Sequence, residues 1–275
     1  MGKALSLTAT AAEYEAAYNN RARVPEHTDI LERWYAQSSQ IIEQTPPDTF
    51  EYGPSPRQKI DWFDAGSGAP VAVFLHGGYW QVLDRTVFSF VAPPLVQQGI
   101  SVAVVGYDLC PDVTLGKLIN QVRQAVEFIR QKTGKRPFIF GQSAGGHMAA
   151  GMLSEGRARG ALALSGVFDL EPIVHTSLNE ALRLDPVLAK ALSPLYWPVP
   201  NGSCPGGTAL DCWVGGDESN EFVRQSRTMA AEWGGKGATT RVEIVDGLNH
   251  FTMVDQLADP DSPLVKRIVA MAKAD

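Results

Sequence analysis

The sequence predicts an α/β fold in which helices cover both faces of a mainly parallel central sheet. Strand-like and helix-like segments alternate from residue 58 onward. Several of the strand-like segments, among them 71–76 and 101–107, are continuous apolar runs, as expected of parallel strands buried on both faces. The 275 residues are enough for one large domain with its own core.

The pattern assigns each element in order. Strands are expected at 58–63, 71–76, 101–107, 137–141, 160–166, 209–216 and 240–247, and helices at 84–98, 114–133, 143–155, 219–233 and 263–273. Because crossovers between parallel strands are right-handed, few topologies fit this order.

Two regions lie outside the alternation. Residues 8–20 and 27–43 have the pattern of two amphipathic helices, and 167–207 contains six prolines among short helical fragments. We therefore expect a single domain over 1–275, with the segment 1–43 and the insertion 167–207 forming a small cap over the active site. The alternative for 167–207 is a long surface connection.

Composition excludes several classes of protein. The net charge is −6, which disfavours nucleic-acid binding, and no apolar stretch reaches the roughly 18 residues of a membrane span. Cys110, Cys204 and Cys212 form no CxxC pair and favour a reducing, cytoplasmic location. No HExxH or Cys/His cluster indicates a metal, so no cofactor is expected. The expected partner is a small molecule, and a homo-oligomer remains open.

The central motif is GQSAG at 141–145. An apolar strand precedes it and a helix of small residues follows it, which is the setting of a nucleophile elbow. That context predicts the α/β-hydrolase fold with Ser143 as nucleophile. The alternative is a glycine-rich loop with a solvated serine.

A serine hydroxyl needs a histidine base, which in turn needs a carboxylate to orient it. On this fold the chain order is serine, acid, histidine. Three histidines follow Ser143, namely His147, His175 and His250, and His147 lies one turn along the helix after the serine, where it is expected to pack. His250 comes after the last strand and is the expected base, whereas His175 lies in the irregular insertion.

The expected acid is Asp217, which directly follows the strand at 209–216. The neighbouring Glu218 is either an exposed neighbour or the acid itself. Asp169 also follows a strand but has the alternative role of capping a short helix. Asp211 lies within a strand and is a poorer candidate.

The tetrahedral intermediate of acyl transfer needs fixed backbone donors for its oxyanion. The motif HGGYW at 76–80 ends a strand, and glycines allow close approach of the backbone. Gly77, Gly78 and Ala144 are the expected donors. His76 is expected to orient this loop, since it precedes the serine in the chain.

Four aromatic residues near these motifs are expected to line a pocket for a flat substrate, although each has the alternative of a core position. They are Tyr79, Trp80, Tyr196 and Trp197.

HGGYW, GYDLCPDVTL and GQSAGGH together resemble the kynurenine formamidases (arylformamidases), within the wider group of HGG-type esterases. The similarity is densest over 71–150 and continues through GGDES, GLNHF and the N-terminal EYEAAYNNRARV. The resemblance implies hydrolysis of N-formylkynurenine to kynurenine and formate, with Ser143, Asp217 and His250 as the triad. The segment 167–207 has no clear counterpart in the family.

Two other functions stay open at this point. One is a small-acyl carboxylesterase or N-acyl-arylamine amidase that uses the same triad. The other is a non-catalytic binding protein on a hydrolase fold, but such proteins typically lack a triad member. Here the serine, the acid and the histidine all have candidates.

Overall fold

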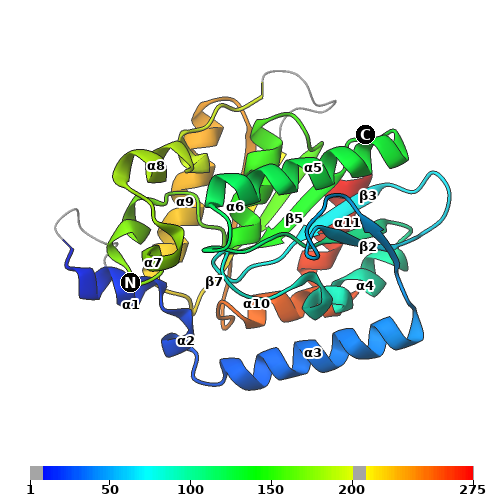
Figure 1. Cartoon of the computed structure of the whole chain (residues 1–275), viewed down its shortest axis with the longest axis horizontal. Coiled ribbons are helices and arrows are strands. Elements are labelled where there is room, and N and C mark those ends of the chain that lie inside the picture. Colours follow the sequence, from blue (N-terminus) through cyan, green and yellow to red (C-terminus); the bar gives the residue numbers. More distant parts are fainter. Residues whose placement is uncertain (1–8, 201–208, 275) are drawn as a thin grey trace.

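The computed structural model describes residues 9–200 and 209–274. Its centre is an eight-stranded sheet in the order β1-β2-β4-β3-β5-β6-β7-β8 (Figure 1). The strands are β1 (Asp48–Glu51), β2 (Lys59–Phe63), β3 (Val71–Leu75), β4 (Ser101–Val105), β5 (Phe138–Gln142), β6 (Gly160–Leu164), β7 (Ala209–Gly215) and β8 (Thr239–Val245).

The strands from β3 to β8 pair in parallel, while β1 and β2 form an antiparallel edge. All seven predicted strands are confirmed, with ends within two residues of those expected. The strand β1 was not predicted, because Asp48–Glu51 is short, mostly exposed and flanked by prolines. The buried centre of the sheet, β3 to β6, is built from the continuous apolar runs.

Helices cover both faces, as predicted. They are α1 (Ala11–Tyr18), α2 (Asn20–Arg23), α3 (His27–Gln44), α4 (Ala92–Val96), α5 (Leu115–Thr133), α6 (Ala144–Ser154), α7 (Asn179–Leu182), α8 (Pro186–Ala191), α9 (Asn220–Gly235), α10 (Thr252–Asp255) and α11 (Pro263–Lys273). Short 3₁₀ helices are η1 (Arg85–Val91), η2 (Glu171–His175), η3 (Pro194–Tyr196) and η4 (Gln256–Ala258).

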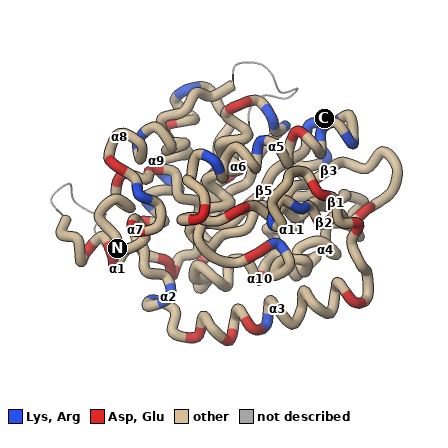
Figure 2. The backbone as a smooth tube through the Cα atoms, in the orientation of Figure 1, with Lys and Arg blue, Asp and Glu red and all other residues tan. Residues whose placement is uncertain are grey.

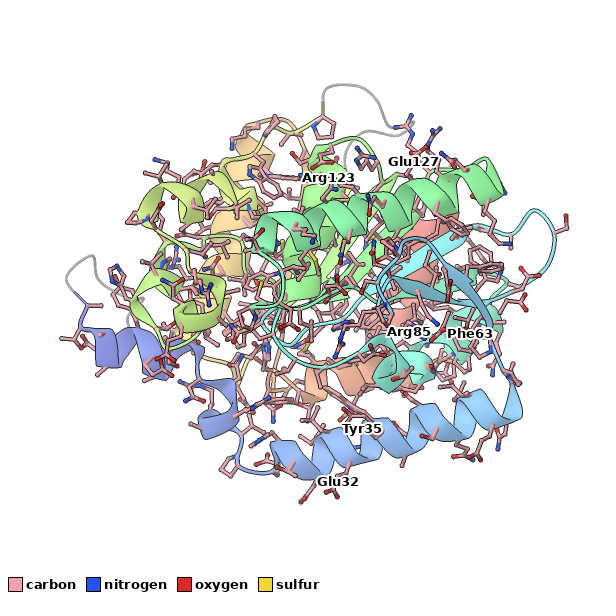
Figure 3. All side chains as sticks on the ribbon, viewed as in Figure 1. Glu32, Tyr35, Phe63, Arg85, Arg123 and Glu127 are labelled. Atoms are coloured by element: carbon pink, nitrogen blue, oxygen red, sulfur yellow. The ribbon has the colours of Figure 1, made fainter. Side chains whose placement is uncertain are left out.

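The sheet separates two apolar cores. Side chains of α5, α6 and α9 fill the core on one face, and side chains of α3, α4 and α11 fill the core on the other. On α3, Trp34 is buried while Glu32 and Tyr35 are exposed (Figure 3). The helical period of about 3.6 residues therefore determines which side chains of α3 face the core and which face solvent.

The N-terminal segment is not one helix followed by another, as the pattern over 8–20 suggested. α1 ends at Tyr18, and Asn19 begins α2 by accepting a hydrogen bond from the Ala22 N–H at 3.1 Å. Asparagine favours such capping positions over a helix interior, which explains the break.

This segment is anchored to the domain by buried bonds. The Tyr18 hydroxyl donates to Glu221 on α9 at 2.7 Å, and Ser38 on α3 donates to the Val87 carbonyl at 2.6 Å. Acidic and basic residues are interspersed along the described chain (Figure 2). The segment thus packs on the rest of the chain: α3 runs along one face of the sheet, while α1 and α2 lie beside the candidate site (Figure 1).

Candidate active site

Ser143 lies between β5 and α6 with φ 56° and ψ −113°, a conformation that only a tightly built turn imposes on a residue with a side chain. The neighbouring glycines make the turn possible. A Cβ on Gly145 would lie 1.8 Å from the Leu75 carbonyl oxygen, and one on Gly141 would lie 2.5 Å from the backbone of Gly145. The strand, sharp turn and helix of a nucleophile elbow are therefore present at this serine.

His250 follows β8 and is buried, with 5% of its surface exposed. Its Nδ1 lies 2.7 Å from Oε2 of Glu218, which follows β7. The other carboxylate oxygen, Oε1, accepts from the Gly215 N–H at 2.8 Å and from the Ser165 hydroxyl at 2.5 Å. The Glu218 carboxylate is thus held on both oxygens, and it fixes the imidazole ring with the proton on Nδ1.

The structure does not place Asp217 against His250, contrary to the sequence-based expectation. Asp217 is exposed, and its N–H donates to the Leu248 carbonyl at 3.0 Å. This bond fixes the turn after β7 so that Glu218 is the residue that turns inward. The carboxylate that faces His250 is therefore the alternative candidate Glu218, one position after the expected residue, because a strand pattern alone does not separate two adjacent carboxylates.

The other residues considered for the acid and the base make contacts elsewhere in the structure. Asp211 pairs with Arg267 at 2.6 Å, and Asp169 pairs with Arg224 at 3.3 Å. Burial raises the pKa of Asp169 above its ordinary value, and its Oδ1 accepts from the N–H of Glu171, the first residue of η2, at 3.2 Å. The ring of His175 stacks on Tyr14, with centroids 5.0 Å apart.

Gln142, which no motif singled out as functional, lies beside the histidine. Its Nε2 is 3.0 Å from Nε2 of His250, so the amide donates to the nitrogen that Glu218 leaves unprotonated. Its Oε1 sits 1.8 Å from where a Cβ on Gly77 would lie. The Ser143 hydroxyl has no hydrogen-bond partner among residues 9–200 and 209–274. The basic nitrogen is therefore occupied by Gln142 in this arrangement.

The expected oxyanion donors lie where β3 ends beside the elbow. Ala144 is the first residue of α6, where the helix leaves N–H groups without intrahelical partners. Gly78 has φ 105°, and a Cβ there would lie 2.3 Å from the Val82 carbonyl oxygen. A side chain at Gly77 would clash with Gln142 and one at Gly78 with Val82, so both positions require glycine, and of the three expected donors Gly78 lines the cavity described below.

His76 supports this loop and is not a base. Its Nδ1–H donates to the Gly77 carbonyl at 2.7 Å, and the Tyr107 hydroxyl donates to the His76 carbonyl at 2.6 Å. Burial lowers the pKa of His76 to about 4, so the ring stays neutral at physiological pH.

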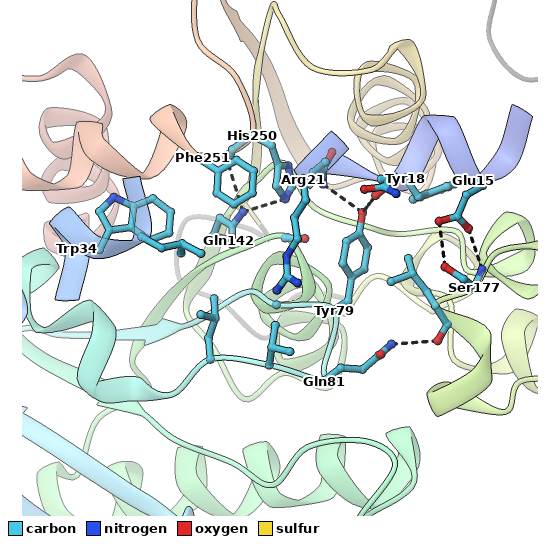
Figure 4. Close-up of a pocket in the computed structure, with 18 residues that line it drawn as sticks. Glu15, Tyr18, Arg21, Trp34, Tyr79, Gln81, Gln142, Ser177, His250 and Phe251 are labelled. Carbon is cyan, nitrogen blue, oxygen red and sulfur yellow. Dashed lines mark hydrogen bonds between the residues drawn. The ribbon is translucent and has the colours of Figure 1, made fainter. Parts of the chain in front are cut away.

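A cavity of about 300 Å³ opens onto Ser143 and His250 (Figure 4). Its walls come from the N-terminal segment, the loop after β3, the elbow, the insertion and the loop after β8. The lining residues are Glu15, Tyr18, Asn19, Asn20, Arg21, Leu31, Trp34, Gly78, Tyr79, Gln81, Val82, Leu83, Gln142, Ser143, Ser177, Leu178, His250 and Phe251.

Of the four aromatic residues expected in the pocket, the structure places Tyr79 there. Its hydroxyl donates to the Tyr18 carbonyl at 2.6 Å and accepts from Asn20 Nδ2 at 3.1 Å. Trp34 and Phe251, which were not expected, also line the cavity.

The structure does not place Trp80, Tyr196 or Trp197 in the cavity. Trp80 is wholly buried against His147, with ring centroids 5.1 Å apart. Tyr196 donates to Glu171 at 3.0 Å, and Trp197 donates to the Ala191 carbonyl at 2.8 Å. This part of the insertion packs on α6 and α9, away from the pocket, so its aromatic residues cover helices.

Two further sequence expectations can be set against the structure. Among the described residues, no group of histidine, cysteine and acidic side chains is arranged to hold a metal ion, and no helix is long and apolar enough to cross a membrane. Cys110 and Cys212 are buried free thiols, and burial raises the pKa of Cys110 to about 11. Cys204 lies outside the described residues.

Comparison with known proteins agrees with this geometry. A family model described as the alpha/beta hydrolase fold matches residues 72–199. The kynurenine formamidase of Danio rerio is 31% identical over 86% of this chain and 84% of that protein. The kynurenine formamidase of Drosophila melanogaster is 31% identical over 78% of each chain.

Solved structures share the fold. The crystal structure of a putative thioesterase from Silicibacter sp. TM1040 has a TM-score of 0.83 and 31% identity, covering 95% of this chain and 99% of that one. An esterase from Pyrobaculum calidifontis, with a TM-score of 0.67 and 15% identity over 90% of this chain and 94% of that one, shares the fold alone. The chain is therefore an arylformamidase-type hydrolase that belongs to the kynurenine formamidase family of α/β-hydrolases.

Proposed function

We propose that this protein hydrolyses N-formylkynurenine, or a closely related aryl formamide, to the aryl amine and formate through a formyl-enzyme on Ser143. The proposal rests on the His250–Glu218 pair, in which Nδ1 of the histidine lies 2.7 Å from Oε2 of the glutamate. His250 and the strained Ser143 line the same cavity. The identity to kynurenine formamidases supports the choice of substrate.

In the first half-reaction, His250 Nε2 takes the proton of the Ser143 hydroxyl while Oγ attacks the formyl carbon. The carbonyl oxygen becomes an oxyanion, which the N–H groups of Gly77, Gly78 and Ala144 stabilise. The C–N bond then breaks, and the protonated His250 gives its proton to the departing aryl amine.

In the second half-reaction, His250 takes a proton from water, and the resulting hydroxide equivalent attacks the formyl ester. The bond to Oγ breaks, formate leaves, and the proton returns to Ser143. Throughout, Glu218 stabilises the imidazolium without taking its proton. The amide of Gln142 gives up its place at Nε2 to the Ser143 hydroxyl when the site becomes active.

The residues that line this pocket also support the predicted cap. We infer that the described parts of the two segments, 9–43 and 167–200, cover the site together, since Tyr18 and Trp34 from the first and Ser177 and Leu178 from the second line the cavity. The two buried free thiols, Cys110 and Cys212, support a reducing location such as the cytoplasm.

The test is a hydrolysis panel of N-formylkynurenine, formanilide, acetanilide and p-nitrophenyl acetate, compared by kcat/KM. We expect N-formylkynurenine to give the highest value and formanilide to exceed acetanilide. An enzyme that cleaves the p-nitrophenyl ester but neither formamide is instead a small-acyl carboxylesterase, and the proposal is then wrong. An enzyme that favours acetanilide is an N-acyl-arylamine amidase.

A further inference from the structure

The N-terminal segment contributes two opposite charges to the pocket that holds Ser143 and His250. Glu15 from α1 and Arg21 from α2 both line the cavity, and no other aspartate, glutamate, lysine or arginine does so among the described residues. In Figure 4, Arg21 extends into the cavity between Trp34 and Tyr79, while Glu15 lies beside Ser177. The cavity therefore offers one cation and one anion on its N-terminal wall.

The Arg21 guanidinium forms no ion pair or hydrogen bond within residues 9–200 and 209–274. Arg21 and its neighbour Arg23 on the same helix are both exposed, but only Arg21 lines the cavity. A guanidinium presents parallel N–H donors that match a carboxylate in a bidentate pair. Arg21 thus has the chemistry and the free donors to bind a carboxylate inside the pocket.

Glu15, by contrast, is held in place. Its Oε2 accepts from the Ser177 N–H at 2.8 Å, and its Oε1 accepts from the Ser177 hydroxyl at 2.9 Å. Each carboxylate oxygen keeps a further acceptor site, and these two donors leave the negative charge unpaired. Glu15 is thus a fixed anion that can accept from an ammonium group.

Asn20 adds a second acceptor to the cavity wall. It is 4% exposed and lines the cavity, and its Oδ1 is buried without a hydrogen-bond partner among the described residues. Its Nδ2 donates to the Tyr79 hydroxyl at 3.1 Å, which fixes the orientation of the amide. A buried acceptor without a partner is costly, and an N–H donor from a ligand would relieve that cost.

We propose that Arg21, Glu15 and Asn20 form a subsite for the zwitterionic end of an α-amino acid. Arg21 binds the carboxylate, and Glu15 with Asn20 binds the ammonium. The inference rests on the proposed function, because it makes the preferred substrate an aryl formamide that carries an amino-acid side arm. It goes beyond that function by assigning the selection for the side arm to the N-terminal segment, away from the reacting groups.

The experiment compares four formamides that share the same aromatic ring and ketone. They are N-formylkynurenine, its analogue without the ammonium, its analogue without the carboxylate, and ortho-formamidoacetophenone, which lacks both groups. We expect Arg21→Gln to lower kcat/KM about 10- to 100-fold for the two substrates that carry a carboxylate. Glu15→Gln should do the same for the two that carry an ammonium. Neither variant should change kcat/KM for ortho-formamidoacetophenone by more than about three-fold.

Matched controls separate binding from structure. Arg23→Gln removes the same charge from α2 outside the cavity and should leave all four substrates unchanged. Ser177→Ala weakens the hold on Glu15 but keeps its charge, and it should cost less than Glu15→Gln on ammonium-bearing substrates. Equal losses on all four substrates in Arg21→Gln, or losses in Arg23→Gln that match it, would overturn the subsite. A wild-type enzyme that hydrolyses none of the four would instead refute the proposed function.

Discussion

Oε2 of Glu218 lies 2.7 Å from Nδ1 of His250, while the neighbouring Asp217 is exposed to solvent. Glu218 is 6% exposed and also accepts from Ser165 and from the backbone of Gly215. A buried carboxylate with both oxygens satisfied can orient an imidazole and stabilise its charged form. This relationship makes Glu218 the acid of the proposed triad.

Exchanging the acid for its amide tests that assignment. Glu218→Gln should lower kcat for N-formylkynurenine by roughly 10⁴, because an amide facing Nδ1 favours the wrong tautomer of His250. Asp217→Asn is the matched control and should change kcat by less than about three-fold. If Asp217→Asn lowered kcat more than Glu218→Gln, and both variants still unfolded cooperatively, Asp217 would be the acid.

The acyl group offers a second test. Formyl aryl amides should be hydrolysed with higher kcat/KM than acetyl ones after each value is divided by the rate of hydroxide-catalysed hydrolysis. The acyl group is expected to lie in the cavity that Ser143 and His250 line, where a formyl group needs less room than an acetyl group. One methyl group in such a pocket changes kcat/KM by about 10- to 200-fold. A corrected ratio of formanilide to acetanilide near one would contradict the expected preference.

Tyr18 fixes the N-terminal segment to the domain. Its hydroxyl donates to Glu221 at 2.7 Å and accepts from Gln225 at 2.9 Å, both on α9. Tyr18→Phe should lower the free energy of unfolding by about 1–3 kcal/mol, because buried polar groups lose a partner. Urea denaturation checks this, with Tyr35→Phe, an exposed tyrosine on α3, as the control. Equal stabilities of the two variants would show that the hydroxyl does not anchor the segment.

His147 makes stability depend on pH. Burial lowers its pKa to about 4 from an ordinary value of 6.5, and its Nε2–H donates to the Leu192 carbonyl at 2.8 Å. Between these values the unfolded state binds the extra proton, so stability falls as pH falls from about 6.5 towards 4. The titration of His147 alone lowers the free energy of unfolding by up to about 3 kcal/mol.

Urea unfolding at pH 7 and pH 5 measures this effect. In His147→Gln the difference in stability between the two pH values should shrink. The half-buried His27, changed to glutamine, serves as the control and should leave the difference intact. A wild-type protein that is equally stable at both pH values would contradict the neutral, buried state of His147.

Much of the fold could be predicted from the sequence, because its signals are local. Continuous apolar runs identify β3, β4 and β5, and the GQSAG turn between a strand and a helix identifies Ser143. His250 was found by the chain order and by its place after the last strand. These features depend on neighbours within a few residues, which is the range that pattern analysis covers.

The rest depends on contacts between distant segments. Glu218 rather than Asp217 faces His250 because a backbone bond to Leu248 turns the loop after β7. Likewise, Glu15 and Arg21 reach the pocket only through the docking of α1 and α2 across the sheet. Tyr196 and Trp197 were expected in the pocket, but the insertion directs them onto helices instead. No local pattern encodes these positions.

Ser143 is the proposed nucleophile of an arylformamidase reaction. The most direct measurement is kcat for N-formylkynurenine in Ser143→Ala, with circular dichroism to verify the fold. We expect kcat to fall by a factor on the order of 10⁶, since the substitution removes one oxygen from a 1% exposed side chain and leaves the turn intact. A variant that keeps more than about a hundredth of the wild-type kcat would contradict it and require another nucleophile.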